Sequence, residues 1–220
     1  HNEGKYEPKI ENLPLIHNDL TELEAVNRMC YFGLQTGIKL HIVHTTLPES
    51  YFIIKDYRKK GLNVTFETCP QYVFLDNSYL KGERAPYYTC NPPLRDKKKS
   101  IRLLKLLEKE KVDFFTTDHC GFTDLEKTEN TDIRKMPFGM PSLGYSLRLM
   151  LNHFGKKYFR KIVRLMGTNS ASVLGIRRRG DIKKGNYADI VIVSEKAPAP
   201  MELPEYDSSG FNPYEHVKNH

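Results

Sequence analysis

Residues 114–119 read Phe114-Phe115-Thr116-Thr117-Asp118-His119, a run of apolar, β-prone residues that stops at a carboxylate and an imidazole. A second run, Leu40-His41-Ile42-Val43-His44, ends in a histidine, and residues 63–68 form a third β-prone run. Short apolar runs that are bounded by polar and turn residues predict buried strands.

Helices are predicted between these strands. Apolar residues recur at helical spacing before Gly37, and Thr21 with Glu24 three residues later matches a capping box. Residues 48–60 predict a second helix, and residues 97–109 predict a third, amphipathic one. The expected buried face of the third helix consists of Ile101, Leu104, Leu106 and Leu107. Strands that alternate with helices predict an α/β fold with a parallel sheet or barrel.

The character of the sequence changes after Gly175. Residues 158–174 predict a further helix, whereas residues 180–193 predict a β-hairpin with its turn at Lys184-Gly185. We therefore expect three regions: residues 1–175 as part of a hydrolase barrel, residues 176–198 as strands of a small β domain, and residues 199–220 as an extended C-terminal arm.

Charge and cysteine content limit the classes of partner. The 220 residues carry a formal charge of +7, but the basic runs are short, scattered and free of interleaved aromatic residues. Such runs predict solvated surfaces, so we expect no nucleic acid as partner. The four cysteines form no C-x-x-C pair, and no segment is apolar enough to cross a bilayer. We expect a cytoplasmic protein with no membrane partner.

Three candidate metal ligands lie at predicted strand ends: His1, His44 and Asp118. Imidazole and carboxylate groups bind zinc, and a hydrolytic site must leave one coordination position open for water. Spacing alone does not decide whether His44 is a metal ligand or a structural histidine. By period-two alternation, His41 is expected to point to the other side of its strand and to have a structural role. His119 has two possible roles: it supports a metal ligand through a hydrogen bond, or it only packs against its neighbours.

The order of motifs resembles the cyclic amidohydrolases, the family of dihydroorotase, dihydropyrimidinase (D-hydantoinase) and allantoinase. The motifs that carry the resemblance are His1-Asn2-Glu3, Leu40 to His44, Glu67-Thr68-Cys69-Pro70-Gln71-Tyr72, Asn91-Pro92-Pro93-Leu94-Arg95, Thr117-Asp118-His119, Pro137-Phe138-Gly139, Asn169-Ser170-Ala171 and Gly180 to Val193.

The resemblance implies a (β/α)₈ barrel with a binuclear zinc centre that a carboxylated lysine bridges. It implies that His1 and His44 bind one metal, and that Asp118 binds the other and carries a proton from water to the leaving nitrogen. The family's H-x-H motif and its bridging lysine are missing from the sequence. We therefore expect the C-terminal half of such a barrel, with strands five to eight, plus part of a small β-sandwich. This half alone is expected to be inactive.

The two substrate loops resemble dihydroorotase, because Asn91, Phe138 and Gly139 match its pattern. The expected reaction is the reversible closure of N-carbamoyl-aspartate to dihydroorotate, and a small cyclic amide or ureido acid is the expected partner. The segment from Glu67 to Tyr72 instead resembles the dihydropyrimidinase and hydantoinase branch, which is the alternative. Departures from both patterns occur at Gly121, Ser142 and Tyr145. A non-catalytic scaffold remains a further alternative, and a homo-oligomer is expected.

Overall fold

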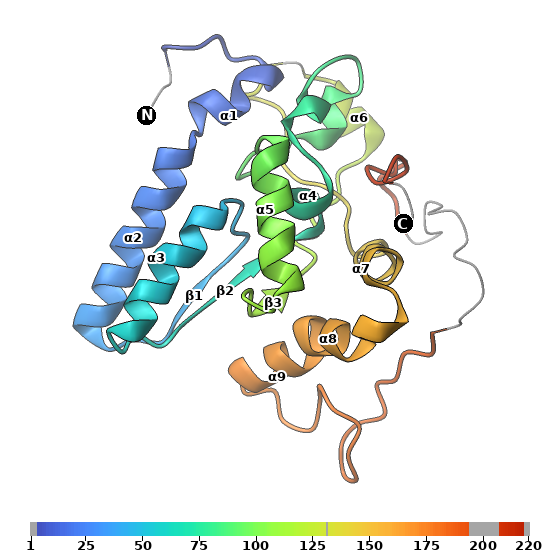
Figure 1. The fold of residues 1–220 in the computed structure, drawn as a ribbon. Coiled ribbons are helices and arrows are strands. Elements are labelled where there is room, and N and C mark those ends of the chain that lie inside the picture. Colours follow the sequence, from blue (N-terminus) through green and yellow to red (C-terminus); the bar gives the residue numbers. More distant parts are fainter. Residues whose placement is uncertain (1–3, 131, 194–206, 218–220) are drawn as a thin grey trace.

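Parallel strands form the centre of the fold, which a computed structural model describes for residues 4–130, 132–193 and 207–217 (Figure 1). The strands are β1 (Leu40–Ile42), β2 (Val64–Thr68) and β3 (Phe114–Phe115), in the spatial order β1-β2-β3. Ile42 pairs with Phe66, and Thr68 pairs with Phe115. The predicted parallel sheet is confirmed, although β1 and β3 are shorter than the runs that predicted them.

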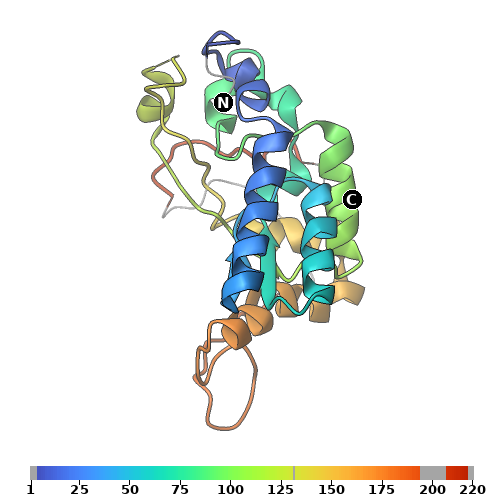
Figure 2. The ribbon, with the colours of Figure 1, turned by 90° about the vertical axis from the view of Figure 1, so that its left-hand side faces the viewer.

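Helices connect the strands as the sequence predicts. Helix α2 (Asp19–Thr36) precedes β1, α3 (Pro48–Lys59) connects β1 to β2, and α5 (Lys97–Glu108) lies between β2 and β3. These helices stand side by side, with α3 between α2 and α5 (Figures 1 and 2). A parallel strand pair requires such a crossover, because a short turn cannot bring the chain back to the same end of the sheet.

The helix-covered face of the sheet is identified by β2. Val64, Phe66 and Thr68 are buried, and the Phe66 ring lies 6.3 Å from that of Tyr51 on α3. Successive side chains of a strand point to opposite faces, so Thr65 and Glu67 lie on the face away from α3.

The ends of α2 correct one prediction. The N-cap is Asn18, whose side chain accepts a hydrogen bond from the backbone N–H of Thr21 at 3.2 Å. Thr21 lies inside the first turn, where its hydroxyl donates to the Asn18 carbonyl at 2.6 Å. The predicted capping box at Thr21 is therefore wrong. Gly37 ends the helix as predicted, with a φ of 69° that only glycine adopts freely.

The buried face of α5 also differs from the prediction. Leu107 is buried as predicted, and Leu104 and Leu106 are partly buried against the core. Ser100 and Leu103 are buried as well, whereas Ile101 is 43% exposed. The spacing of three and then four residues places the buried set on one stripe, and Ile101 lies outside it. The hydroxyl of Ser100 donates to the Leu75 carbonyl at 2.8 Å, which satisfies this polar group within the stripe.

Shorter helices complete the described chain. The predicted helix over residues 158–174 is confirmed as α8 (Phe159–Val163), a π-helical turn (Arg164–Thr168) and α9 (Asn169–Val173). The others are 3-10 helices at Ile10–Asn12, Asn77–Leu80, Ala85–Tyr88 and Lys156–Tyr158, together with α1 (Leu13–Ile16), α4 (Pro70–Phe74), α6 (Asp124–Thr128) and α7 (Ser146–Phe154).

Residues 176–193 form no strand in the structure, so the hairpin predicted over 180–193 is not found there. Its turn at Lys184-Gly185 is present, and the backbone N–H of Tyr187 donates to the Arg178 carbonyl at 2.9 Å. The apolar residues of this segment remain exposed: Ile182, Ile190, Val191 and Ile192. An isolated hairpin gains too little apolar burial in water to form a stable ladder. Residues 194–198 of the expected β domain lie outside the described residues.

The described part of the predicted C-terminal arm, residues 207–217, packs against the chain itself. The Phe211 ring lies 4.6 Å from that of Tyr87, and the Tyr214 ring lies 5.5 Å from that of Tyr145. Tyr214 is fully buried, and its hydroxyl is 2.8 Å from the Ser142 hydroxyl. Tyr214 therefore belongs to the same hydrophobic core as the strands and helices.

The fold is thus a mixed α/β structure with a small parallel sheet. The closed barrel and its fifth strand stay a prediction, because the segment that would end in His1 lies outside the described residues. Within the described ranges, no helix has both the length and the apolar character needed to cross a membrane.

Candidate active site at the carboxyl ends of the strands

The chain bends sharply just beyond the ends of β1 and β3. His44 and Asp118 both have left-handed backbone conformations, with φ values of 37° and 45°. Non-glycine residues rarely adopt these values, and such strain is concentrated at functional sites. The two residues that the sequence selects as ligands are therefore also two sites of backbone strain.

The carboxyl group of Asp118 holds a proton more readily than an ordinary aspartate. Burial raises the pKa of Asp118 above its usual value; a charged His44 lowers it, the negative charge of Glu67 raises it, and a hydrogen bond from Gln71 lowers it. The net shift is upward. The structure therefore brings His44, Glu67 and Gln71 within interaction range of the Asp118 carboxylate.

Gln71 fixes the orientation of this carboxylate. It lies in the first turn of α4, immediately after β2, and is 1% exposed. Its Nε2 donates a hydrogen bond of 2.8 Å to Oδ2 of Asp118. Sequence reasoning did not select Gln71, although its place directly after a strand that ends at the same edge was the available signal.

Glu67 connects the site to the exposed face of the sheet. Its Oε2 lies 3.0 Å from Nε2 of His41, whose Nδ1 lies 2.9 Å from the Thr65 hydroxyl. Burial by itself raises the pKa of Glu67, but hydrogen bonds from His41, Thr116 and the backbone of His44 lower it below its ordinary value. Glu67 is therefore held in its charged form beside Asp118.

Strand alternation cannot be used to place His41 and His44 on opposite faces of the sheet, because His44 lies beyond the end of β1. Strand β1 ends at Ile42, and the positive φ of His44 interrupts the alternating pattern. His41 instead joins the polar group of Glu67 through hydrogen bonds that suit the structural role expected for it.

His119 fastens a neighbouring loop to the end of β3. Its Nδ1 accepts hydrogen bonds from the backbone N–H groups of Ser142 at 3.1 Å and Leu143 at 3.2 Å. A nitrogen that accepts two such bonds carries no hydrogen, so the neutral ring is protonated on Nε2. These bonds give His119 a role in packing the loop against β3. Its role as support for a metal ligand stays a prediction.

The two predicted substrate loops touch each other. The backbone N–H of Gly139 donates to the Thr89 carbonyl at 3.0 Å. A Cβ atom at Gly139 would lie 2.6 Å from the Cys120 carbonyl oxygen, so no side chain fits at this position. The loop that carries Phe138 and Gly139 is thereby held between the Asn91 loop and the segment that follows Asp118.

A cavity of about 350 Å³ lies along β1 and α2, and His44 and Asn91 are both in its lining. Asn91 is exposed, and the peptide bond between Asn91 and Pro92 is cis. Of the described residues, neither Asp118 nor Phe138 is part of this lining. His44 and Asn91 thus line the same cavity. His44 also interacts electrostatically with the Asp118 carboxylate.

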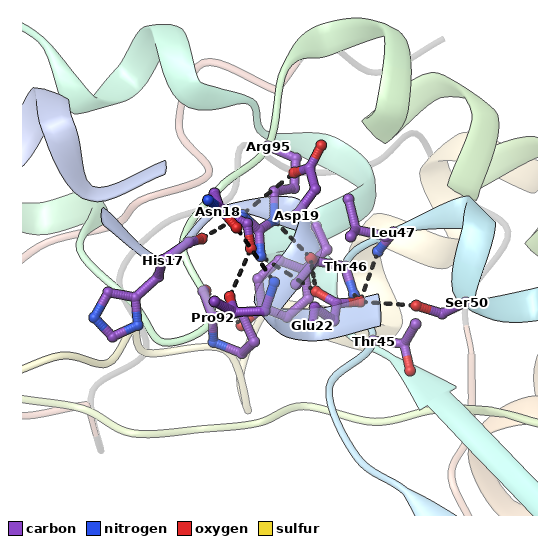
Figure 3. Close-up of polar contacts among 12 residues, drawn as sticks. His17, Asn18, Asp19, Glu22, Thr45, Thr46, Leu47, Ser50, Pro92 and Arg95 are labelled. Carbon is purple, nitrogen blue, oxygen red and sulfur yellow. Dashed lines mark hydrogen bonds and ion pairs between the residues drawn. The ribbon is translucent and has the colours of Figure 1, made fainter. Parts of the chain in front are cut away.

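Arg95 is buried beside this cavity and ties three segments together (Figure 3). It is 3% exposed, and its Nη1 donates to the His17 carbonyl at 2.6 Å. Its Nε donates to the Thr46 hydroxyl at 2.9 Å, and its Nη2 lies 3.3 Å from Oε2 of Glu22. The desolvation of this ion pair is offset by the additional hydrogen bonds.

Glu22, the partner of Arg95 on α2, also caps the start of α3 (Figure 3). Its Oε1 accepts hydrogen bonds from the backbone N–H groups of Thr46 and Leu47, both at 3.0 Å, and from the Ser50 hydroxyl at 3.1 Å. Helix starts leave backbone N–H groups unpaired, and here a carboxylate from another helix satisfies them. The segment that follows His44 is thereby fixed. Sequence reasoning missed this pair.

The donor set fits a metal site in kind but is incomplete. His44 and Asp118 supply the imidazole nitrogen and carboxylate oxygen that zinc binds. Over the described parts of the chain, no cluster of three or more His, Cys, Asp or Glu residues is arranged to hold a metal ion. The third predicted ligand, His1, lies outside the described residues.

Comparisons with known proteins show which family the chain resembles. The model of the amidohydrolase family matches residues 11–219. A dihydroorotase from Methanosphaera stadtmanae is 33% identical over 199 residues, which cover 89% of this chain and 45% of that protein. An allantoinase from Salmonella paratyphi B is 29% identical over 176 residues, which cover 79% of this chain and 38% of that protein.

Solved structures agree with the sequence relatives. A D-hydantoinase superimposes with a TM-score of 0.76 at 29% identity, covering 85% of this chain and 42% of that one. A D-hydantoinase (dihydropyrimidinase) from Thermus sp. gives a TM-score of 0.77 at 25% identity with the same coverage. The chain spans less than half the length of these relatives. The family match over nearly the whole chain leads to one conclusion: the chain belongs to the amidohydrolase family.

Proposed function

We propose that this chain supplies the proton-carrying carboxylate and part of the substrate pocket of a metal-dependent cyclic amidohydrolase. The observation that carries the proposal is Asp118, which is partly buried, has a raised pKa, is oriented by Gln71 and lies in range of His44. A carboxylate with this environment can take a proton from water and later release it to a leaving group.

Dihydroorotase is the proposed activity, the reversible closure of N-carbamoyl-aspartate to dihydroorotate. The motif around Asn91 and the motif around Phe138 and Gly139 support it, and both belong to loops that contact each other. A dihydroorotase is also among the most similar curated relatives. Hydantoinase or dihydropyrimidinase is the second candidate, favoured by the segment Glu67 to Tyr72 and by the solved structures. The third candidate is a non-catalytic scaffold, which would bind a partner but catalyse no reaction.

The proposed ligand and substrate roles rest on the family resemblance, and the role of Gln71 rests on its contact with Asp118. His44 and Asp118 would hold divalent metal, together with His1 and with ligands that this sequence lacks. When bound, such ions lower the pKa of a water molecule and polarise the amide carbonyl. Asp118 takes the water's proton and delivers it to the ring nitrogen, while Gln71 keeps Oδ2 in place. Asn91 and the Phe138 loop orient the ring.

The test is a spectrophotometric assay of the full-length protein that contains this chain, with dihydroorotate, dihydrouracil and hydantoin offered in parallel. Turnover of dihydroorotate supports the first candidate, and turnover of a neutral ring alone supports the second. No turnover together with no stoichiometric zinc by elemental analysis would establish the scaffold instead.

Asp118→Asn tests the assigned role within the same protein. We expect zinc content to remain largely intact and turnover to be lost. Asp56→Asn is the matched control, because Asp56 pairs with Lys59 at the surface of α3. Retained activity in Asp118→Asn would refute the role of Asp118.

A further inference from the structure

Lys127, on α6, is a buried amine whose hydrogen-bond partners are all neutral. Its side chain is completely buried. The Nζ atom donates to the Thr89 carbonyl at 3.1 Å, to the Thr89 hydroxyl at 2.7 Å and to the Pro137 carbonyl at 3.1 Å. Within the described part of the chain, no carboxylate forms an ion pair with it. A buried lysine without a counterion is costly, so its presence here calls for a specific reason.

The three acceptors belong to the two substrate loops. Thr89 stands two residues before Asn91, and Pro137 stands immediately before Phe138. The loops also meet directly, through the hydrogen bond from Gly139 N–H to the Thr89 carbonyl. One ammonium group therefore bridges the loop of Asn91 and the loop of Phe138 and Gly139. Its three N–H donors match three oxygen acceptors, which offsets part of the desolvation cost.

The surroundings provide no strong compensating charge. Burial lowers the pKa of Lys127 to about 8, and negative charge on Cys90 or Cys120 would raise it. Burial raises the pKa of the Cys90 thiol to about 12, so Cys90 is uncharged near neutral pH. The Phe122 ring lies 5.8 Å from Nζ and adds a weak attraction.

We propose that Lys127 is a positioning residue that holds the two substrate loops in one arrangement and thereby sets the affinity for the cyclic substrate. The assignment rests on the proposed function, because the loops matter only if they contact substrate. Deprotonation leaves an amine with two N–H donors, so one of the three bonds to the loops is lost. The clamp therefore weakens as pH rises through the pKa of Lys127.

The kinetic test compares full-length wild-type protein with Lys127→Met and with Lys135→Met, whose side chain is exposed near the same loop. In Lys127→Met we expect KM to rise about tenfold or more, since hydrogen bonds to a charged group are lost, while kcat changes much less. Lys135→Met should match wild type. A folded Lys127→Met protein with an unchanged KM overturns the proposal.

The pH dependence separates positioning from a merely structural role. The KM of the wild type should rise above about pH 8, and this rise should be absent in Lys127→Met. A wild-type KM that stays constant from pH 7 to about pH 9.5 overturns the proposal without any variant. If Lys127→Met does not fold, Thr89→Val removes the hydroxyl acceptor, together with the bonds that this hydroxyl donates to the Pro86 carbonyl at 2.9 Å and the Pro137 carbonyl at 3.4 Å. KM should rise in the same direction, and an unchanged KM there counts against the clamp.

Hydrogen exchange of the full-length protein distinguishes failure of this proposal from failure of the proposed function. Peptides that cover residues 86–93 and 135–142 should exchange faster in Lys127→Met than in wild type, whereas peptides of α2 should not. If no cyclic amide is turned over but both loops exchange faster, the clamp stands and the proposed function falls. If the peptides of both loops exchange at the same rate in Lys127→Met as in wild type, the clamp is overturned, whatever the activity.

Discussion

Gln71 donates a hydrogen bond of 2.8 Å from Nε2 to Oδ2 of Asp118, a residue 47 positions away in the sequence. The bond crosses from the start of α4 to the end of β3, and the parallel register of β2 and β3 brings these ends together. The carboxylate that we propose to receive and release a proton is thus oriented by a buried amide.

Replacement of Gln71 tests this orientation. In Gln71→Leu we expect kcat to fall on the order of ten- to a hundredfold, because the carboxylate is free to rotate away from its productive position. The bond also lowers the pKa of Asp118, so its loss should move the acidic limb of the kcat profile to higher pH. Steady-state kinetics from pH 5 to 9 measure both effects.

Gln35→Leu is the matched control, because Gln35 is exposed near the end of α2. It should reproduce the wild-type profile. Equal activity of the two leucine variants would show that Gln71 does not orient the carboxylate.

The buried pair of Arg95 and Glu22 should dominate the stability of the loops around the cavity. Arg95→Met leaves a buried carboxylate without its partner and should lower the free energy of unfolding by about 3–5 kcal/mol. Arg102→Met removes an exposed pair with Glu49 and should cost at most about 1 kcal/mol. Urea unfolding of the full-length protein measures both values.

A double-variant cycle sharpens this prediction. Arg95→Met combined with Glu22→Leu should be less destabilising than the sum of the two single changes, because no unpaired charge remains. Strict additivity would show that the two side chains act independently.

Gly139→Ala should displace the Phe138 loop. The added Cβ would lie 2.6 Å from the Cys120 carbonyl oxygen, and we expect a loss of about 1–3 kcal/mol in unfolding free energy together with weaker substrate binding. Gly167→Ala serves as control, since no atom lies within 4 Å of a Cβ built there. Thermal unfolding and KM report the two effects; identical values for both variants would contradict the close approach.

Glu67 should make stability depend on pH. Its pKa is lowered in the folded state, so its contribution is present above the unfolded value near 4.5 and is lost as pH falls through the folded value. The difference in unfolding free energy between wild type and Glu67→Gln should therefore be larger at pH 7 than at pH 3. A difference that is independent of pH would show that the charge of Glu67 contributes nothing.

Local patterns in the sequence predicted the elements but not the partnerships between them. The runs around Ile42, Phe66 and Phe115 predicted parallel strands, and Gly37 predicted a helix end, because each signal lies within a few residues. The buried face of α5 was predicted only in part: Leu107 is buried as expected, but packing against α3 and α4 also buries Leu103 and leaves Ile101 exposed. The hairpin over 180–193 failed because its stability depends on a neighbouring sheet.

Candidate site residues divide in the same way. His44 and Asp118 could be found from the sequence because they end apolar runs and match a family pattern. Gln71 had only a weak signal, its place directly after a strand. Arg95 and Lys127 could not be found, because their importance comes from partners 73 and 38 residues away. The role of His1 and the completed barrel stay predictions.

The contact of Tyr214 with Ser142 links residues 207–217 to the surroundings of Asp118. The same Ser142 that meets the Tyr214 hydroxyl also holds the His119 ring through its backbone N–H, and His119 directly follows Asp118. Deleting residues 207–217 would remove this brace and uncover Tyr145. Changes to a segment about 90 residues beyond Asp118 would therefore alter the surroundings of the proposed proton carrier.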